Sequence, residues 1–402
     1  MTGVDSDVVI VGAGLVGLAT ARAILARDPR LRVSLLEKEP EPARHQSSHN
    51  SGVVHSGIYY RPGSRRARLC REGRNLMLRF IHDHAIPHRV CGKLLVATYE
   101  HEIPLLEDLF ARGKENGLQG LERLSAREIR ELEPEATGLT ALRVPETSIV
   151  DYAEVARVLA RELTESGARL RLGEELVAGR RGKDGWELTT RTGTSRARFL
   201  VNCAGLQADR VARAVGSDPK GRIVPFRGEY LRIGGSLGNR VRGLVYPVPD
   251  PELPFLGVHI TPTMNRGILA GPNALLAPSR EGYDRSDLSP RDLWDTLTFP
   301  GFPRFLLKNP TTEMHELAHS ASRAKTLRDI RALIPAVRAE DLSWGFFGIR
   351  AQFMDPTGAL VDDFAFVPGE GSLHVLNAPS PAATASLSIG EAIAGDVLHR
   401  LS

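Results

Sequence analysis

A glycine-rich turn near the N-terminus holds the first residues whose types and spacing indicate chemistry. The turn runs Gly12-Ala13-Gly14-Leu15-Val16-Gly17 and directly follows the apolar run 7–11. Gly12 permits a tight turn, Gly14 lets the backbone approach a pyrophosphate, and Gly17 lets a helix pack close to a sheet. A helix that begins here directs the positive end of its dipole at the phosphates.

An acidic residue completes this pattern. Glu37 closes a second apolar run, 31–36, and lies 20 positions after Gly17. A carboxylate at that place accepts hydrogen bonds from an adenosine ribose. Strand, glycine turn, helix, strand and acid together predict a dinucleotide-binding βαβ unit, and therefore a redox cofactor. The motif alone does not choose between FAD and NAD.

The elements that must position this unit are spread along the chain. Helices are expected over 15–26 and 64–84 and from Asp151 onward. A strand over 199–202 ends in a small-residue turn that returns the chain to the first sheet. A strand over 374–377 leads into a C-terminal helix over 382–401, with Pro381 at its first position and Ser380 as its cap.

Residues 221–345 differ in character from the rest. Proline and glycine are frequent, and β-rich pieces such as 229–233 and 256–261 predict a mostly antiparallel sheet, with helices around 290–307 and 314–334. We therefore expect an α/β protein with a discontinuous, Rossmann-like nucleotide domain and an inserted α+β substrate domain. The expected bounds are 1–90, 150–215 and 345–402 for the first, and 91–149 and 216–344 for the second.

Composition and charge limit the classes of protein to which this chain can belong. The chain has 402 residues, 25% of them charged, a net charge of +4 and three cysteines without a CxxC pair, which predicts a globular protein with reduced thiols. No apolar run spans a bilayer, and no signal peptide, metal-ligand cluster or nucleic-acid-binding pattern is recognised. We expect a cytoplasmic protein, whose basic surface allows peripheral contact with the inner face of the membrane.

Several further blocks carry a family resemblance. They include residues 45–64, 91–93, 225–230, 246–251, 254–259, 271–274, 348–352 and 377–384. In order and content these blocks resemble the L-2-hydroxyglutarate oxidases and dehydrogenases, within the D-amino acid oxidase-like flavoproteins. The resemblance implies FAD in a glutathione-reductase-type domain. It also implies oxidation of L-2-hydroxyglutarate, a small dicarboxylic hydroxy acid, to 2-oxoglutarate by hydride transfer from C2 to flavin N5.

The resemblance and the glycine motif together imply a set of FAD-binding residues. A helix N-terminus at Pro381 offers free amides and a positive dipole end to the reduced flavin. The predicted contacts are Gly12, Gly14, Leu15, Val16, Gly17, Glu37, Lys38, Ser47, Ser48, Asn50, Ser51, Gly52, Val53, Gly205, Pro379, Ser380, Pro381, Ala382, Ala383 and Thr384. Whether the flavin is covalently attached, for example near His49, stays open.

A 2-hydroxy acid needs a base for its hydroxyl proton and cations for its carboxylates. Histidine suits the first task, and His55 and His259 are both candidates. Arginine suits the second, because it pairs with a carboxylate through two hydrogen bonds. The candidate carboxylate and hydrogen-bond partners are Arg227, Arg350, Arg61, Tyr246, Tyr230 and Gln352; Arg350 is expected after a glycine-rich turn.

Two other readings remain open from the sequence. One is an oxidase or dehydrogenase of the same fold that acts on another small 2-hydroxy or amino acid. The other is a flavin-binding redox carrier without turnover. The electron acceptor is also open between oxygen, a quinone and a carrier protein.

Overall fold

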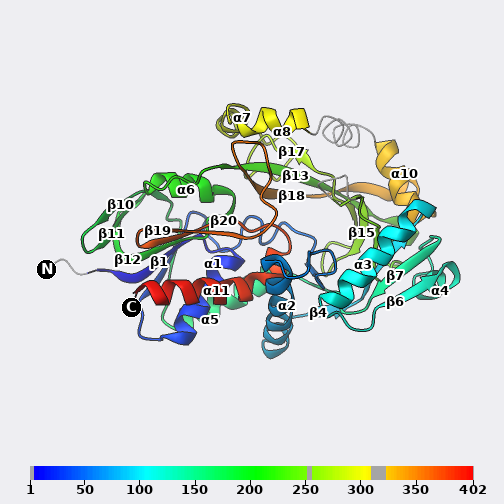
Figure 1. The fold of residues 1–402 in the computed structure, drawn as a ribbon, viewed down its shortest axis with the longest axis horizontal. Coiled ribbons are helices and arrows are strands. Elements are labelled where there is room, and N and C mark those ends of the chain that lie inside the picture. The colour runs from blue at the N-terminus through cyan, green and yellow to red at the C-terminus, as the bar shows by residue number, and fades with distance from the viewer. Residues whose placement is uncertain (1–3, 251–255, 309–322, 402) are drawn as a thin grey trace.

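The computed structural model describes residues 4–250, 256–308 and 323–401 (Figure 1). The first part of the helix predicted over 314–334, and residues 251–255 of two resemblance blocks, lie outside the described residues. The described chain is a mixed α/β structure with two large sheets and one small sheet.

The first sheet contains the glycine turn. Its strands follow the order β10-β11-β12-β1-β2-β9, with β20 paired to β12 and β19 paired to β20. The β1–β2, β1–β12, β2–β9 and β12–β20 pairs are parallel, as expected of a nucleotide-binding sheet. The strands are β1 (Ser6–Val11), β2 (Val33–Glu37), β9 (Arg169–Leu172), β10 (Leu176–Gly182), β11 (Gly185–Thr190), β12 (Thr194–Asn202), β19 (Ala365–Gly369) and β20 (Ser372–Asn377).

Helices cover one face of this sheet, and a hydrophobic core lies between the helices and the sheet. Figure 1 shows α11 beside α1, with α5 and α2 near them, and their buried apolar side chains form one cluster with those of the sheet. The helices are α1 (Leu15–Arg27), α2 (Arg65–Asp83), α5 (Tyr152–Glu165) and α11 (Ala382–Leu401). Ser64 caps α2 and Asp151 caps α5 through side-chain oxygens. The bounds of α11 agree with the predicted 382–401, but Pro381 lies at the cap position in place of Ser380, because its carbonyl accepts the first helical hydrogen bond, from the Ala385 N–H.

The second sheet is mostly antiparallel, as predicted, with one parallel pair between β5 and β14. Its order is β17-β13-β16-β15-β14-β5-β7-β6, and β18 pairs with β13. The strands are β5 (Lys93–Ala97), β6 (Glu122–Ser125), β7 (Thr140–Val144), β13 (Arg222–Ile233), β14 (Leu244–Pro247), β15 (His259–Pro262), β16 (Ile268–Gly271), β17 (Leu275–Leu276) and β18 (Leu342–Met354).

Shorter elements complete the described chain. The remaining α-helices are α3 (Ile103–Glu115), α4 (Ala126–Leu132), α6 (Ala208–Ala214), α7 (Pro290–Leu297), α8 (Gly301–Lys308) and α10 (Arg323–Leu333), and the short 3₁₀ helices are η1 (Glu100–Glu102), η2 (Gly205–Gln207), η3 (Gly235–Leu237) and η4 (Ala339–Asp341). A small sheet consists of β3 (Val53–Val54), β8 (Ser148–Val150) and β4 (His88–Val90), and β3 directly precedes His55 in the chain.

The strand pairing does not agree with the expected domain boundary at residue 345. Residues 345–354 were predicted to belong to the nucleotide domain, but they lie in β18, which pairs with β13 from Leu342 to Met354. We propose that the second domain includes β18 and that the chain returns to the first domain after it. Arg350 is therefore in the middle of a long strand and not after a glycine-rich turn.

Candidate active site

One elongated cavity of about 1940 Å³ connects the glycine turn with residues of the second sheet. Its walls include the β1–α1 turn, the 45–66 segment, the start of α11, and parts of β13, β14 and β18. Pockets for a single small ligand have volumes of roughly 300–1,000 Å³. The cavity therefore has room for a dinucleotide together with a small substrate.

The nucleotide end of the cavity has the geometry that the glycine motif predicts. Gly12, Gly14, Leu15, Val16, Glu37 and Lys38 all line it. The Glu37 carboxylate holds the turn by accepting hydrogen bonds from the Ala13 N–H, at 2.8 Å, and from the Glu39 N–H, at 3.0 Å. Gly17 does not line the cavity. A Cβ there would lie 2.0 Å from the Gly12 carbonyl oxygen, so its role is close packing of α1 against the turn.

The middle of the cavity is lined by most of the other predicted cofactor residues. These are Ser47, Asn50, Ser51, Val53, Gly205, Pro379, Ser380, Pro381, Ala382 and Ala383. The small side chains of Ala382 and Ala383, at the N-terminus of α11, leave room for a ring beside the positive end of the helix dipole. Glycine turn, polar segment and helix end thus fit the predicted FAD.

Three predicted contacts serve instead to hold the cavity wall. Ser48 bonds to the His45 carbonyl and to His49, and a Cβ on Gly52 would meet the Val150 carbonyl oxygen at 2.6 Å. The Thr384 hydroxyl bonds to Tyr152, at 3.0 Å, and to the backbone N–H of His55. None of the three lines the cavity.

Two histidines lie at the substrate end. The His259 ring is buried, 4.0 Å from the Tyr246 ring, and its Nδ1 is 2.9 Å from the Gly257 carbonyl oxygen. A carbonyl only accepts, so Nδ1 carries the hydrogen and Nε2 keeps a lone pair. Burial lowers the pKa of His259 to about 3. Burial, with the nearby charge of Lys93, also lowers the pKa of His55 well below its ordinary value, so both rings are neutral at physiological pH.

The predicted arginines separate into two groups. Arg350 and Gln352 lie on one face of β18 and line the cavity, as do Arg61, Tyr230 and Tyr246. Arg227 does not line it, so the structure does not support its predicted role at the substrate. Its guanidinium pairs with Glu229, at 2.9 Å, and lies over the Phe347 ring. Because side chains alternate along a strand, Gly228 of β13 faces the cavity and Arg227 faces away.

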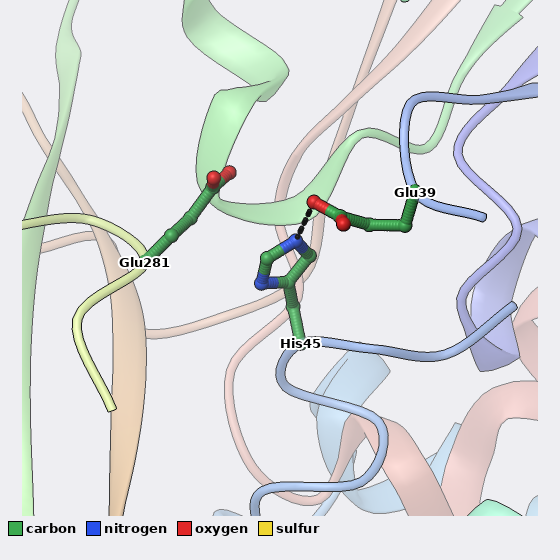
Figure 2. A group of neighbouring side chains, drawn as sticks. All are labelled: Glu39, His45 and Glu281. Carbon is green, nitrogen blue, oxygen red and sulfur yellow. Dashed lines mark hydrogen bonds and ion pairs between the residues drawn. The ribbon is translucent and has the colours of Figure 1, made fainter. Parts of the chain in front are cut away.

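A cluster of possible metal ligands borders the nucleotide end. Figure 2 shows Glu39, His45 and Glu281, whose ligating atoms lie within 4.8 Å of one another. The Lys38 ammonium occupies the same place: its Nζ is 2.9 Å from His45 Nε2 and 2.9 Å from a Glu281 oxygen, and it also bonds to Glu39. We therefore interpret the cluster as an ion-pair network around a lysine.

Sequence reasoning missed several residues of this site. Tyr59, Tyr60 and Arg66 line the substrate end, and 174–177 line the nucleotide end. Lys93 is buried behind Tyr59 and Tyr246. Tyr59 and Tyr60 lie in a block that carries the resemblance, and Lys93 is a charged residue at the start of an apolar strand. Both features are visible in the sequence. The sequence around them does not show, however, which side chains face the cavity.

The fold and the site define a flavoenzyme, and a family comparison agrees. The model of the DAO family, FAD dependent oxidoreductase, matches residues 7–395. Among solved structures, L-α-glycerophosphate oxidase from Mycoplasma pneumoniae with FAD bound has a TM-score of 0.78 at 22% identity, covering 98% of this chain and 94% of that one. Glycine oxidase from Bacillus cereus has a TM-score of 0.72 at 15% identity, with 98% and 95% covered.

Curated relatives specify the family further. L-2-hydroxyglutarate dehydrogenase from Indibacter alkaliphilus is 43% identical over 98% of this chain and 100% of its own length. The mitochondrial L-2-hydroxyglutarate dehydrogenase of Homo sapiens is 41% identical, covering 98% and 89%. The chain therefore belongs to the FAD-dependent oxidoreductases of the DAO family and, within them, to the L-2-hydroxyglutarate dehydrogenase family. Its cofactor is FAD.

Proposed function

We propose that the protein oxidises L-2-hydroxyglutarate to 2-oxoglutarate, the activity that the names of its relatives state. The observation that carries the proposal is the substrate end of the cavity, where two neutral histidines and Arg350 lie near the N-terminus of α11. FAD, when bound, supplies the acceptor for the hydride that leaves C2. The chain itself must take the hydroxyl proton and hold the two carboxylates.

His259 is the proposed acceptor of the hydroxyl proton. Its Nδ1–H is donated to the Gly257 carbonyl, which orients the ring and leaves Nε2 as the basic atom. The contact with Tyr246 limits rotation of the ring. His55 is the alternative base, and its Nδ1 is buried without a hydrogen-bond partner.

Arg350 is the proposed partner of the carboxylate beside the reacting carbon. One of its nitrogens donates to the Asn273 carbonyl, at 3.0 Å, which fixes the guanidinium on β18. A Cβ on Gly228 would lie 3.2 Å from the same nitrogen, so glycine at 228 leaves the space that the guanidinium needs. Gln352 and Tyr246 are proposed as neutral hydrogen-bond donors to the substrate.

Anaerobic mixing of the purified yellow protein with candidate acids tests the function. L-2-Hydroxyglutarate is expected to bleach the flavin absorbance, and its D enantiomer serves as the control. Bleaching by another hydroxy or amino acid, with none by L-2-hydroxyglutarate, would replace the proposed substrate. An absence of bleaching by every acid would favour a redox carrier.

The electron acceptor and the membrane contact are separate proposals. Oxygen, a quinone and a carrier protein are distinguished by reoxidation of the reduced protein with each one. Peripheral contact with an anionic bilayer is supported by α7, where Trp294 is 71% and Leu297 56% exposed beside the exposed Arg291. In the described part of the chain, no helix combines the length and apolarity that crossing a membrane requires. Co-sedimentation with anionic and neutral vesicles tests the contact.

A further inference from the structure

A buried lysine behind the cavity wall has no role in the scheme above. Lys93, the first residue of β5, is 2% exposed, and its Nζ has no hydrogen-bond partner. The Nζ lies 4.8 Å from the centre of the Tyr59 ring and 4.4 Å from that of Tyr246. Both rings line the cavity, so the amine lies directly behind its wall.

An ammonium in such a place is costly unless an anion compensates it. In the described residues, no carboxylate forms an ion pair with Lys93, and the groups that favour its charged form are the thiols of Cys70 and Cys91. Two aromatic faces compensate only part of the lost hydration. Burial accordingly lowers the pKa of Lys93 to about 7.

Two further polar atoms near this lysine are also unsatisfied. The Tyr59 hydroxyl and His55 Nδ1 are buried without hydrogen-bond partners. The Lys93 charge acts on His55, and the Tyr59 ring contacts the amine. An amine and a phenol are both donors, whereas a carboxylate only accepts and has about four acceptor positions. A carboxylate that reached this place could accept from both Lys93 and Tyr59.

We propose that Lys93 binds the substrate carboxylate that is remote from the reacting carbon, and so makes the enzyme select dicarboxylic over monocarboxylic 2-hydroxy acids. The inference rests on the proposed function, in which Arg350 holds the other carboxylate. Because the Nζ and the Tyr59 hydroxyl are shielded from the cavity, binding requires the Tyr59 side chain to shift. Tyr59 then donates to the same carboxylate.

The decisive experiment compares two substrates in the Lys93→Met variant. L-2-Hydroxyglutarate and L-2-hydroxypentanoate have the same carbon chain, but only the first has a remote carboxylate. The ratio of their kcat/KM values is expected to fall about 100-fold in K93M, which is the loss of one charge-assisted contact. The loss is expected mainly in KM for the dicarboxylate, with a much smaller change for the monocarboxylate.

Two controls separate this role from a structural one. Lys114 also lies over an aromatic ring, Phe110 at 4.3 Å, but it is exposed and outside the cavity, so K114M is expected to keep the ratio. K93M is expected to keep its flavin spectrum and its melting temperature, because an unpaired buried ammonium does not stabilise a fold. The Tyr59→Phe variant supplies a milder test, with a smaller change in the same ratio.

Proton uptake gives a readout that does not depend on turnover. At about pH 8 the amine is mostly neutral, and a bound carboxylate favours its charged form. Glutarate is therefore expected to bind more tightly than pentanoate, with uptake of up to one proton, and K93M is expected to lose both effects. An unchanged substrate ratio and unchanged glutarate binding in K93M would overturn the role of Lys93. If only the wild-type turnover of L-2-hydroxyglutarate fails, the proposed function is wrong, and glutarate binding still decides the role of the lysine.

Discussion

Thr384 on α11 accepts a hydrogen bond from the backbone N–H of His55, with 3.0 Å between Oγ1 and N. The two residues lie more than three hundred positions apart in the chain, and the same hydroxyl bonds to Tyr152. The helix that offers its N-terminus to the cofactor thus also fixes a histidine at the substrate end. We propose that this buried hydroxyl couples the cofactor site to the substrate site.

Replacing Thr384 with valine tests this coupling, because valine keeps the shape and removes the hydroxyl. The His55 N–H and the Tyr152 hydroxyl are then left without that partner, which is expected to cost about 1–3 kcal/mol of unfolding free energy. We expect kcat to fall about 10-fold as the His55 segment loosens. Thr384→Ser is the matched control and should restore most of kcat. Equal kcat and melting temperature in T384V and wild type would argue against the coupling.

The contrast between Arg350 and Arg227 gives a second test. Arg350 lines the cavity, whereas Arg227 pairs with Glu229 on the other face of β13. Arg350→Ala is expected to lower kcat/KM about 100-fold for dicarboxylic and monocarboxylic hydroxy acids alike, because both have a carboxylate beside the reacting carbon. Arg227→Lys keeps the charge of the Glu229 pair and should stay within about 3-fold of wild type. A larger loss in R227K than in R350A would reverse the assignment.

Most residues that line the nucleotide end of the cavity could be predicted from the sequence, but fewer of those at the substrate end could. The glycine turn, Glu37 and the start of α11 are local patterns, whose geometry follows from a few neighbouring residues. Arg227 was expected at the substrate but does not line the cavity, because local sequence does not say which face of a strand meets it. The direction in which β13 faces depends on its pairing with β16, β17 and β18, which are distant in the chain. Lys93 was missed for a related reason: its significance depends on the absence of a counter-ion, which is a property of the packed structure.

The pKa of His259 predicts an unusual pH dependence. Burial lowers this pKa to about 3, so the ring stays neutral, and able to accept a proton, well below the pH at which an ordinary histidine becomes charged. Measured against pH, kcat/KM should therefore show no acidic decline near about pH 6.5. His259→Asn is expected to lower kcat about 10²–10⁴-fold. A loss of that size in His55→Asn, with kcat kept in H259N, would instead assign the base to His55.

A buried ion pair joins α6 to the segment after β17 and allows a stability prediction. Arg280, after β17, donates to both carboxylate oxygens of Asp209 on α6, at 2.5 and 3.1 Å, and also to the Leu206 and Ile223 carbonyls. Burial raises the pKa of Asp209, but the hydrogen bonds and charge of Arg280 outweigh this, so the pKa lies below its ordinary value. The stabilising contribution is therefore present at neutral pH and is lost as the pH falls below the ordinary range of a carboxyl group.

Arg280→Met removes the buried cation and leaves the buried Asp209 carboxylate with only the more exposed Arg213, at 3.0 Å, as its charged partner. This is expected to lower the free energy of unfolding by up to about 3–5 kcal/mol. Denaturant titration of the FAD-loaded protein measures the change. Adding Asp209→Asn should recover part of the loss, because the amide keeps the shape of the carboxylate without its charge. The exposed pair Arg123–Glu107 is the matched control, and R123M should cost less than about 1 kcal/mol. A loss in R280M as small as that in R123M would mean that the charge pair does not stabilise the contact between α6 and the segment after β17.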